Sequence, residues 1–279
     1  IRVYRATVKG VSTIIRVVVC GAAGRMGSEV VRTVSREDGM ELVGAVDRHN
    51  LGVDVGVLAG VGPLGVMVSD DLEGVLVSTQ PDVMVDFTTP TSVAANARTA
   101  LRAGVRPVIG TTGMDPNDLA DLGRLSAELR VGTVVAPNFA IGAVLMMKFA
   151  EMAAKFFPAV EIIELHHDQK LDAPSGTALR TAEKISLARG DYRQNTRSAV
   201  ATLEGVRGGC YDGGIRIHSV RLPGLVAHQE VIFGGLGQTL TLRHDSISRE
   251  SFMHGVVLAI HRVMGLEEMV VGLENLIFE

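Results

Sequence analysis

Hydrophobic positions in the first half of the chain follow two periods that alternate along the sequence. Short runs rich in Val and Ile predict buried strands, which lie at 15–19, 41–46, 83–87, 107–109 and 133–135. Apolar residues at helical spacing fill gaps between these runs, at 91–103 and 115–129. Strands that alternate with helices are typical of an α/β fold with a parallel, doubly wound sheet, which binds ligands at the carboxyl ends of its strands. Those ends carry Gly21, Asp47, Thr88, Gly110 and Ala136.

The pattern changes after Asn138. A long helix is predicted at 141–157. A strand that delivers His166 and His167 to its end follows, and a helix at 177–189 comes next. Farther on, polar and apolar residues alternate in three predicted strands, the last two joined by a glycine-rich hairpin, at 215–222, 228–233 and 239–244. This second region is therefore expected to be α+β.

A final helix from Ser248, apolar along one face, is expected to return to the first domain. The chain is therefore predicted to have a discontinuous dinucleotide-binding domain, residues 14–137 and 248–279, with a substrate-binding domain inserted at 138–247. Residues 1–13 are interpreted as a leader before the fold. Their three basic residues and lack of acidic ones are also found in targeting presequences, but a short segment that is disordered or lies against the surface is the preferred interpretation.

Composition narrows the class of protein. The chain has 279 residues, 47% of them hydrophobic and 21% charged, which suffices for two packed domains. A net charge of −4 argues against a nucleic-acid partner. Three charged residues interrupt the most apolar stretch, 141–157, so we expect no membrane partner. Two cysteines, Cys20 and Cys210, are too few for a disulfide framework and favour a cytoplasmic location.

The first strand ends in a G-x-x-G-x-x-G loop from Gly21 to Gly27. In such a loop, backbone N–H groups and the helix dipole attract a pyrophosphate, although a tight structural turn is the alternative. Asp47 ends the second strand, where it can accept hydrogen bonds from ribose hydroxyls. The neighbouring Arg48 can pair with a 2′-phosphate, and a solvated side chain is the alternative. These residues predict a nicotinamide dinucleotide and acceptance of both NADH and NADPH.

The most informative stretch runs from Glu164 to Leu179 and reads E-L-H-H-D-Q-K-L-D-A-P-S-G-T-A-L. It combines two imidazoles and the ammonium of Lys170 with a P-S-G-T turn at a helix entry, where N–H groups attract carboxylates. We therefore expect a substrate with two carboxylates. Neighbouring residues on a strand point to opposite faces, so the two histidines should have different roles. Ser175 lies in no G-x-S-x-G elbow and is interpreted as a capping or carboxylate-binding group.

Other interpretations of this stretch are open. His166, His167 and Asp168 could bind a metal, but adjacent strand histidines diverge and no further cluster completes a ligand set, so no metal is predicted. The two histidines could also be structural. Asp172 either orients Lys170 or caps a turn, and the structural role is favoured.

Taken in order, the motifs resemble the 4-hydroxy-tetrahydrodipicolinate reductase (dihydrodipicolinate reductase) family of bacterial and plant lysine and diaminopimelate biosynthesis. The resemblance covers nearly the whole chain from about Ile15. It rests on the histidine stretch together with G-A-A-G-R-M-G, V-D-F-T, V-I-G-T-T-G, A-P-N-F-A-I-G, L-V-A-H-Q-E-V and R-H-D-S. Met114 departs from the Phe that the family often has, and Asp168 and Gln169 lie at variable positions.

The resemblance implies a Rossmann-like nucleotide domain, broken by a mixed-sheet domain that binds a cyclic dicarboxylate and assembles homotetramers. It implies reduction of 4-hydroxy-tetrahydrodipicolinate to tetrahydrodipicolinate by hydride transfer from NADH or NADPH. His166 would then be the proton donor and acceptor and Lys170 its catalytic partner. Substrate would contact His167, Gly176 and Thr177, and the position of Ser175 in the P-S-G-T turn adds it to these substrate contacts. The dinucleotide would contact Gly21, Ala22, Ala23, Gly24, Arg25, Met26, Asp47, Arg48, Gly110, Thr111, Thr112, Ala136, Pro137, Asn138 and Phe139.

Two alternatives use the same first domain. One is a related nicotinamide oxidoreductase that acts on aspartate or a semialdehyde, which the H-H-x-x-K and P-S-G-T motifs disfavour. The other is a non-catalytic dinucleotide-binding regulator, which the intact His166 and Lys170 disfavour.

Overall fold

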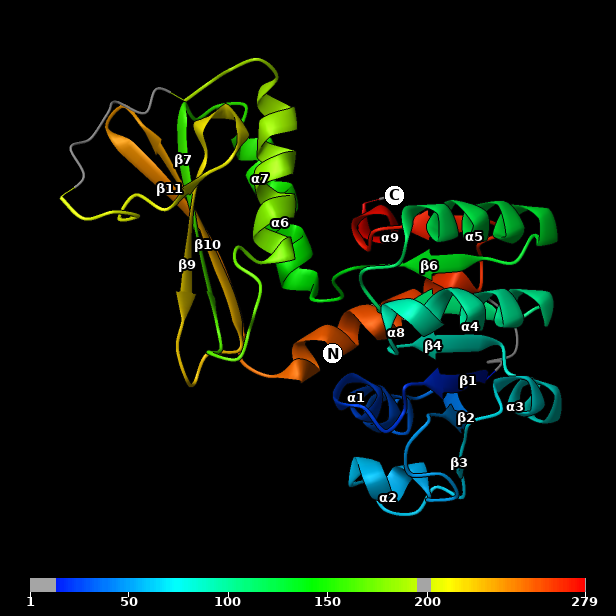
Figure 1. Cartoon of the computed structure of the whole chain (residues 1–279). Coiled ribbons are helices and arrows are strands. Elements are labelled where there is room, and N and C mark those ends of the chain that lie inside the picture. The colour runs from blue at the N-terminus through cyan, green and yellow to red at the C-terminus, as the bar shows by residue number, and fades with distance from the viewer. Residues whose placement is uncertain (1–13, 195–201, 279) are drawn as a thin grey trace. The chain divides into compact units, whose positions relative to one another are not determined.

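The computed structural model describes residues 14–194 and 202–278, which form two compact units (Figure 1). The first unit runs to Phe139 and resumes at Phe252, and the second comprises Ala140–Ser251. The sequence-based boundaries were 137/138 and 247/248. The leader predicted at 1–13 lies outside the described residues. Within the described ranges, no helix is both long and apolar enough to cross a membrane.

The first unit is built on a parallel sheet of seven strands in the order β12-β6-β5-β4-β1-β2-β3. The strand order reverses between β1 and its neighbour β4, where a doubly wound sheet opens a crevice for ligands. The predicted fold is thereby confirmed. The strands are β1 (Ile15–Cys20), β2 (Met40–Val46), β3 (Val68–Ser69), β4 (Val83–Asp86), β5 (Arg106–Ile109), β6 (Thr133–Val135) and β12 (Met269–Val271).

Helices cover this sheet, and their buried faces repeat the helical spacing seen in the sequence. Val93, Ala97 and Leu101 of α4, for example, pack with Ile109 and Val135 of the sheet. The helices of this unit are α1 (Arg25–Val34), α2 (Val55–Ala59), α3 (Leu72–Thr79), α4 (Pro90–Arg102), α5 (Pro116–Leu129), α8 (Met253–Val263) and α9 (Glu274–Ile277). A 3₁₀ turn, Arg249–Phe252, precedes α8, so the final helix begins later than the predicted residue 248.

The second unit has a mixed sheet in the order β11-β10-β7-β9-β8, in which only the pair β7 and β9 is parallel. Its elements are α6 (Ile141–Ala153), β7 (Ala159–His166), α7 (Gly176–Arg189), β8 (Gly209–Cys210), a 3₁₀ turn (Asp212–Gly214), β9 (Arg216–Arg221), β10 (Ala227–Gly235) and β11 (Gln238–Ser246). The predicted hairpin is present, because Gly235 pairs with Gln238 across a two-residue turn. Gly237 adopts a φ of 70° there, which favours glycine.

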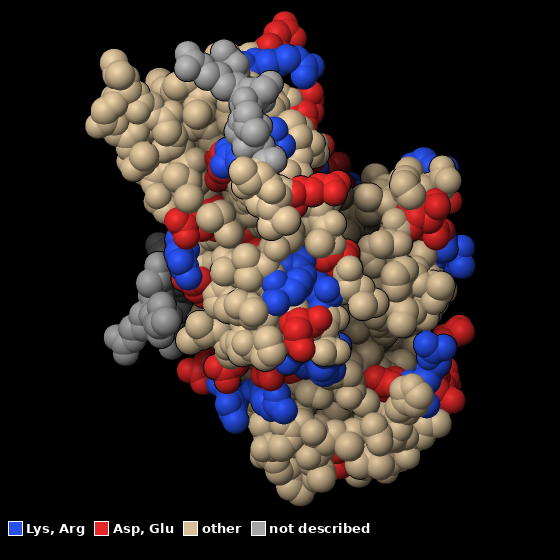
Figure 2. Space-filling model, turned by 60° about the vertical axis from the view of Figure 1, so that its left-hand side comes forward, with Lys and Arg blue, Asp and Glu red and all other residues tan. Residues whose placement is uncertain are grey.

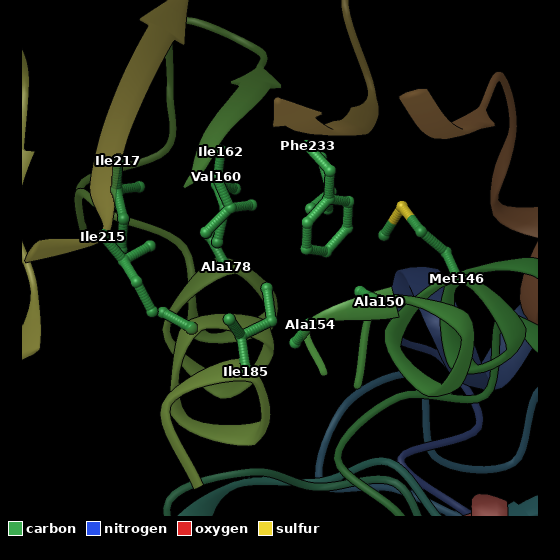
Figure 3. Packing of buried hydrophobic residues seen from close by; sticks show 12 residues of the cluster. Met146, Ala150, Ala154, Val160, Ile162, Ala178, Ile185, Ile215, Ile217 and Phe233 are labelled. Atoms are coloured by element: carbon green, nitrogen blue, oxygen red, sulfur yellow. The ribbon is translucent and has the colours of Figure 1, made fainter. Parts of the chain in front are cut away.

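Helices α6 and α7 pack on one face of this second sheet (Figure 3). The small side chains Ala150 and Ala178 let them approach the strands, and Ile162 and Phe233 fill the space between. Helix α6 was predicted to reach residue 157 but ends at Ala153. Pro158 disfavours helical conformation in the residue before it, which helps to end the helix early.

Charged side chains of both signs lie interspersed with uncharged residues on the face drawn in Figure 2. Many pair locally on exposed surfaces, as Arg180 does with Glu183 along one turn of α7 at 2.8 Å. Pairs of this kind contribute little to stability. The stability of both units therefore rests mainly on their apolar cores.

Candidate active site

A pocket of about 390 Å³ lies where the order of the first sheet reverses, among the segments that follow β1, β4 and β5. Its lining residues are Arg25, Met26, Phe87, Thr88, Pro90, Gly110, Thr111 and Thr112. All of these except Phe87, Thr88 and Pro90 belong to the predicted dinucleotide contacts. Phe87 and Thr88 belong to the V-D-F-T motif at the end of β4 and Pro90 follows it, so this motif was a sequence signal for this part of the wall.

The glycines of the first loop are held by close approach of backbone to backbone. Gly21 has a φ of 77°, and a Cβ there would lie 2.5 Å from the carbonyl oxygen of Phe87. A Cβ on Gly27 would lie 1.9 Å from the oxygen of Gly21. Gly24 precedes α1 without a side-chain cap, so the first N–H groups of that helix are available to an anion. The loop therefore fits a pyrophosphate.

Asp47 ties the glycine loop to the end of β2. Its carboxylate accepts hydrogen bonds from the backbone N–H groups of Ala23 and His49, each at 3.0 Å. Each oxygen keeps a further acceptor site, so the carboxylate can still bind ribose hydroxyls. The guanidinium groups of Arg25 and Arg48 make no hydrogen bond or ion pair to any residue within 14–194 and 202–278. Two cations near this loop are therefore available to phosphate groups.

The predicted dinucleotide contacts at 136–139 lie outside the pocket lining. The side chains of Ala136 and Phe139 are buried, and the Phe139 ring packs on Phe87 with centroids 5.8 Å apart. Pro137 is exposed and Asn138 partly buried. The four residues do not line the pocket. Phe139 instead supports a residue that does.

A buried carboxylate beneath the pocket was missed from the sequence. Asp86 accepts hydrogen bonds from the backbone N–H and hydroxyl of Thr88 at 3.0 and 2.7 Å, and from the hydroxyl of Thr111 at 2.9 Å. Asn96 donates to its other oxygen at 2.8 Å. The side chain thus orients two threonines of the wall. Its position at the end of β4, inside V-D-F-T, was the available signal.

The second unit carries the histidine stretch. Val160 and Ile162 point from β7 into the core, and the same face continues with Glu164 and His166, because side chains alternate along a strand. The row therefore changes from apolar to polar at the carboxyl end of β7. Glu164 is completely buried.

Glu164 accepts a hydrogen bond from Nδ1 of His166, with the two atoms 2.5 Å apart. Arg221, on β9, donates two hydrogen bonds to the same carboxylate, at 2.8 and 2.9 Å. Burial alone raises the pKa of Glu164, but hydrogen bonds from His166, Arg221 and Ser219 outweigh it and lower the pKa to about 2. An ionised carboxylate only accepts hydrogen bonds, so Nδ1 of His166 carries a proton and Nε2 faces away from this bond.

Lys170 lies in the loop that follows. Its ammonium contacts both carboxylate oxygens of Asp172, at 2.7 and 2.9 Å. This hydrogen bond lowers the pKa of Asp172. Asp172 therefore orients Lys170, whereas a structural role had been favoured from the sequence. The carbonyl oxygen of Asp172 also accepts a hydrogen bond from Arg221 at 2.8 Å, which links the loop to the buried pair.

The start of α7 matches the predicted anion turn. Ser175 is the N-cap, and its hydroxyl accepts a hydrogen bond from the N–H of Ala178 at 3.2 Å. The N–H of Ser175 donates to Glu164 at 3.2 Å. Gly176 is exposed, and no atom would lie within 4 Å of a Cβ placed on it. A ligand can therefore approach the backbone there.

The expectation that His166 and His167 both lie on a strand is wrong. Strand β7 ends at His166, so His167 lies in the connection that follows rather than on the strand. Its direction is therefore set by the loop and not by strand alternation. Within the two described ranges, no group of three His, Cys, Asp or Glu side chains could hold a metal ion.

Comparisons with known proteins agree over nearly the whole chain. Residues 15–139 match the family model "Dihydrodipicolinate reductase, N-terminus", and residues 142–277 match the model of its C-terminus. A 4-hydroxy-tetrahydrodipicolinate reductase from Desulfitobacterium hafniense is 56% identical over 262 residues, which is 94% of this chain and 98% of that protein. One from Moorella thermoacetica is 56% identical over 263 residues, with 94% and 98% covered. The solved structure of dipicolinate-bound dihydrodipicolinate reductase from Paenisporosarcina sp. TG-14 is 51% identical, covers 94% of this chain and 99% of its own, and has a TM-score of 0.85.

Proposed function

The chain belongs to the dihydrodipicolinate reductase family, and we propose that the pocket residues of its first unit and the histidine stretch of its second unit carry out the reaction of that family. Its activity is the reduction of 4-hydroxy-tetrahydrodipicolinate, a step of lysine and diaminopimelate biosynthesis. The observation that carries this function is the match of both family models to this chain. It disfavours both an oxidoreductase of aspartate or a semialdehyde and a non-catalytic regulator.

The enzyme uses a nicotinamide cofactor, and we propose that both NADH and NADPH serve. The first loop and the N-terminus of α1 would hold the pyrophosphate, and Asp47 would accept the ribose hydroxyls. Arg48 would pair with a 2′-phosphate. Gly110, Thr111 and the other pocket residues would line the nicotinamide end. When bound, the reduced nicotinamide supplies the hydride.

For the substrate, we propose a grip on both carboxylates. The related structure from Paenisporosarcina is described as dipicolinate-bound, and dipicolinate is a cyclic dicarboxylate. Lys170 would neutralise one carboxylate, and Ser175, Gly176 and Thr177 at the start of α7 would bind the other through hydroxyl and N–H groups. His167 would contact the substrate from the loop. Once the 4-hydroxyl group has left the ring as water, His166 would deliver the proton from Nε2 to the ring carbon next to the one that receives hydride.

A steady-state assay tests the function directly. NADH and NADPH oxidation is followed by absorbance in the presence of the cyclic intermediate formed from pyruvate and aspartate semialdehyde. We expect turnover with each cofactor, and none when aspartate or the semialdehyde alone is supplied. Tight dinucleotide binding without turnover on the cyclic substrate would contradict the proposal.

We also propose that four copies assemble through the second unit. Helices α6 and α7 cover one face of its sheet, and the other face carries partly exposed Ile163, Leu165, Val220 and Ile232. On this face the apolar side chains lie between ion pairs such as His218 with Glu161 and Arg243 with Glu230, a mixed surface of the kind that can pack on another copy. Light scattering coupled to size exclusion is expected to give the mass of a tetramer, and a monomeric mass would contradict it. The exposed thiol of Cys210 agrees with a cytoplasmic location.

A further inference from the structure

We propose that the ion pair of buried Glu164 with partly buried Arg221 positions His166 and sets the pH range in which this histidine stays protonated. The inference rests on the proposed role of His166 as proton donor. Neither Glu164 nor Arg221 is expected to touch the substrate. Both act through the imidazole.

The carboxylate of Glu164 is a junction between three elements. One oxygen accepts hydrogen bonds from Nδ1 of His166 and from Arg221, and the other accepts from Arg221 and from the N–H of Ser175. Both oxygens are therefore held by donors from more than one residue. Because β7, β9 and the start of α7 each supply a donor, the carboxylate cannot rotate without breaking several bonds. The ring of His166 is fixed relative to the turn proposed to bind the substrate carboxylate.

The register of the sheet places Arg221 at this junction. In the parallel pairing of β7 with β9, His166 is the partner of Arg221, and Glu164 is the partner of Ser219. The guanidinium reaches back to form the two hydrogen bonds of a bidentate ion pair. Only an arginine can make this planar, two-point contact with a carboxylate. Glu164 is thereby neutralised while it still accepts from His166.

The two charges act on His166 in opposite directions. A carboxylate that accepts from Nδ1–H stabilises the imidazolium, whereas the nearby guanidinium destabilises it. The loop that follows His166 carries Asp168 and the pair of Lys170 with Asp172. Farther along α7, Arg180 pairs with Glu183, and on β10 Glu230 lies on the opposite face, where it pairs with Arg243. Strand β10 presents Ala227 and Gln229 opposite His166 and Glu164, and α7 begins with Ser175 and Thr177, so both elements are uncharged there. Glu164 and Arg221 are therefore the charges that can tune the histidine.

Two variants separate this role from a merely structural one. Glu164→Gln keeps an acceptor for Nδ1–H but removes the negative charge, so His166 should lose its proton at lower pH. Because turnover requires the protonated donor, the alkaline limb of the kcat profile should move down by about one pH unit. Arg221→Gln removes the positive charge and should move the same limb up by a similar amount. Arg221→Lys keeps the charge and should restore the limb toward that of the unaltered enzyme, although its single-point contact should still lower kcat.

The experiment measures kcat against pH at saturating substrate and cofactor for the full chain and each variant, with thermal unfolding and dinucleotide titration as checks of folding. Shifts of opposite sign support the proposal. Unshifted limbs in folded variants overturn it, and if His166→Ala still loses turnover, the proposed function survives. A fully active His166→Ala enzyme overturns both. If a variant fails to fold, the ¹⁵N chemical shifts of the His166 ring in the unaltered enzyme provide the test. A neutral ring that carries its proton on Nδ1 supports the proposed role of Glu164 and Arg221. A neutral ring that carries its proton on Nε2 overturns the proposal.

Discussion

Replacement of Gly176 by Ala tests the proposed substrate grip with little disturbance of the fold. Gly176 is the first residue of α7, and no atom would lie within 4 Å of the added Cβ. Its φ is not in the left-handed region, so Ala adopts the same backbone conformation. Stability should therefore be unchanged or rise by about 0.4–1 kcal/mol, because the unfolded chain loses freedom.

Substrate binding should respond in the opposite direction. If a carboxylate approaches the N–H groups at the start of α7, the new methyl group stands in its way and one charge-assisted hydrogen bond is lost. Such a bond contributes about 1.5–3 kcal/mol, so KM for the cyclic substrate should rise about 10- to 150-fold. The affinity for NADH should stay the same, because the dinucleotide is proposed to bind the first unit.

The assay compares KM and thermal unfolding of Gly176→Ala with those of Gly265→Ala. Gly265 also lacks a left-handed φ, and its added Cβ would meet only the carbonyl oxygen of Arg262, at an ordinary 3.9 Å. The control should leave both KM and stability near their starting values. A folded Gly176→Ala enzyme with an unchanged KM would refute the assignment of this turn to the substrate.

The remaining predictions concern the other charged groups. His166→Ala should lower turnover by about 10²- to 10⁴-fold with dinucleotide affinity kept, as measured by steady-state kinetics and fluorescence titration; unchanged turnover would exclude it as the proton donor. Lys170→Ala should raise KM and lower kcat, because a substrate carboxylate is left unpaired, whereas an effect confined to NADH affinity would count against its role. Arg48→Ala should raise KM for NADPH more than for NADH, and equal changes would show that it does not bind the 2′-phosphate. The folded pKa of Glu164, about 2, lies below its ordinary value of 4.5, so its contribution to stability is complete above about pH 4.5 and is lost as pH falls toward 2. The free energy of unfolding, measured with urea between these pH values, should change less with pH for Glu164→Gln than for the unaltered chain. Equal slopes of unfolding free energy against pH would contradict this.

The sequence was most informative where the pattern was long and regular. The doubly wound sheet and the α+β second region followed from alternating periods, and the hairpin between β10 and β11 followed from its glycines. Residues 50–80 yielded no prediction, although they contain α2, β3 and α3. Helix α2 has five residues and β3 has two, which is too short for either period to repeat.

Some residues of the site could likewise be predicted from local sequence patterns, and others could not. Glu164 lies two residues before His166 on the same face of a strand, so strand alternation could have identified it as a partner. Arg221 could not have been found this way. It meets Glu164 across 57 residues of chain, through a strand pairing whose register no local pattern specifies. His167 was misplaced because the period of a strand does not reveal the residue at which the strand stops.

Strand β7 combines structural and chemical requirements in one row of side chains, Val160, Ile162, Glu164 and His166. A slip of one residue against β9 and β10 would turn this whole row to the opposite face. The core would then lose Ile162 and Val160 at the same time as His166 lost its hydrogen bond to Glu164. Molecules with this slip should therefore be unstable, so a stably folded second unit is also one in which Glu164 and His166 are correctly aligned.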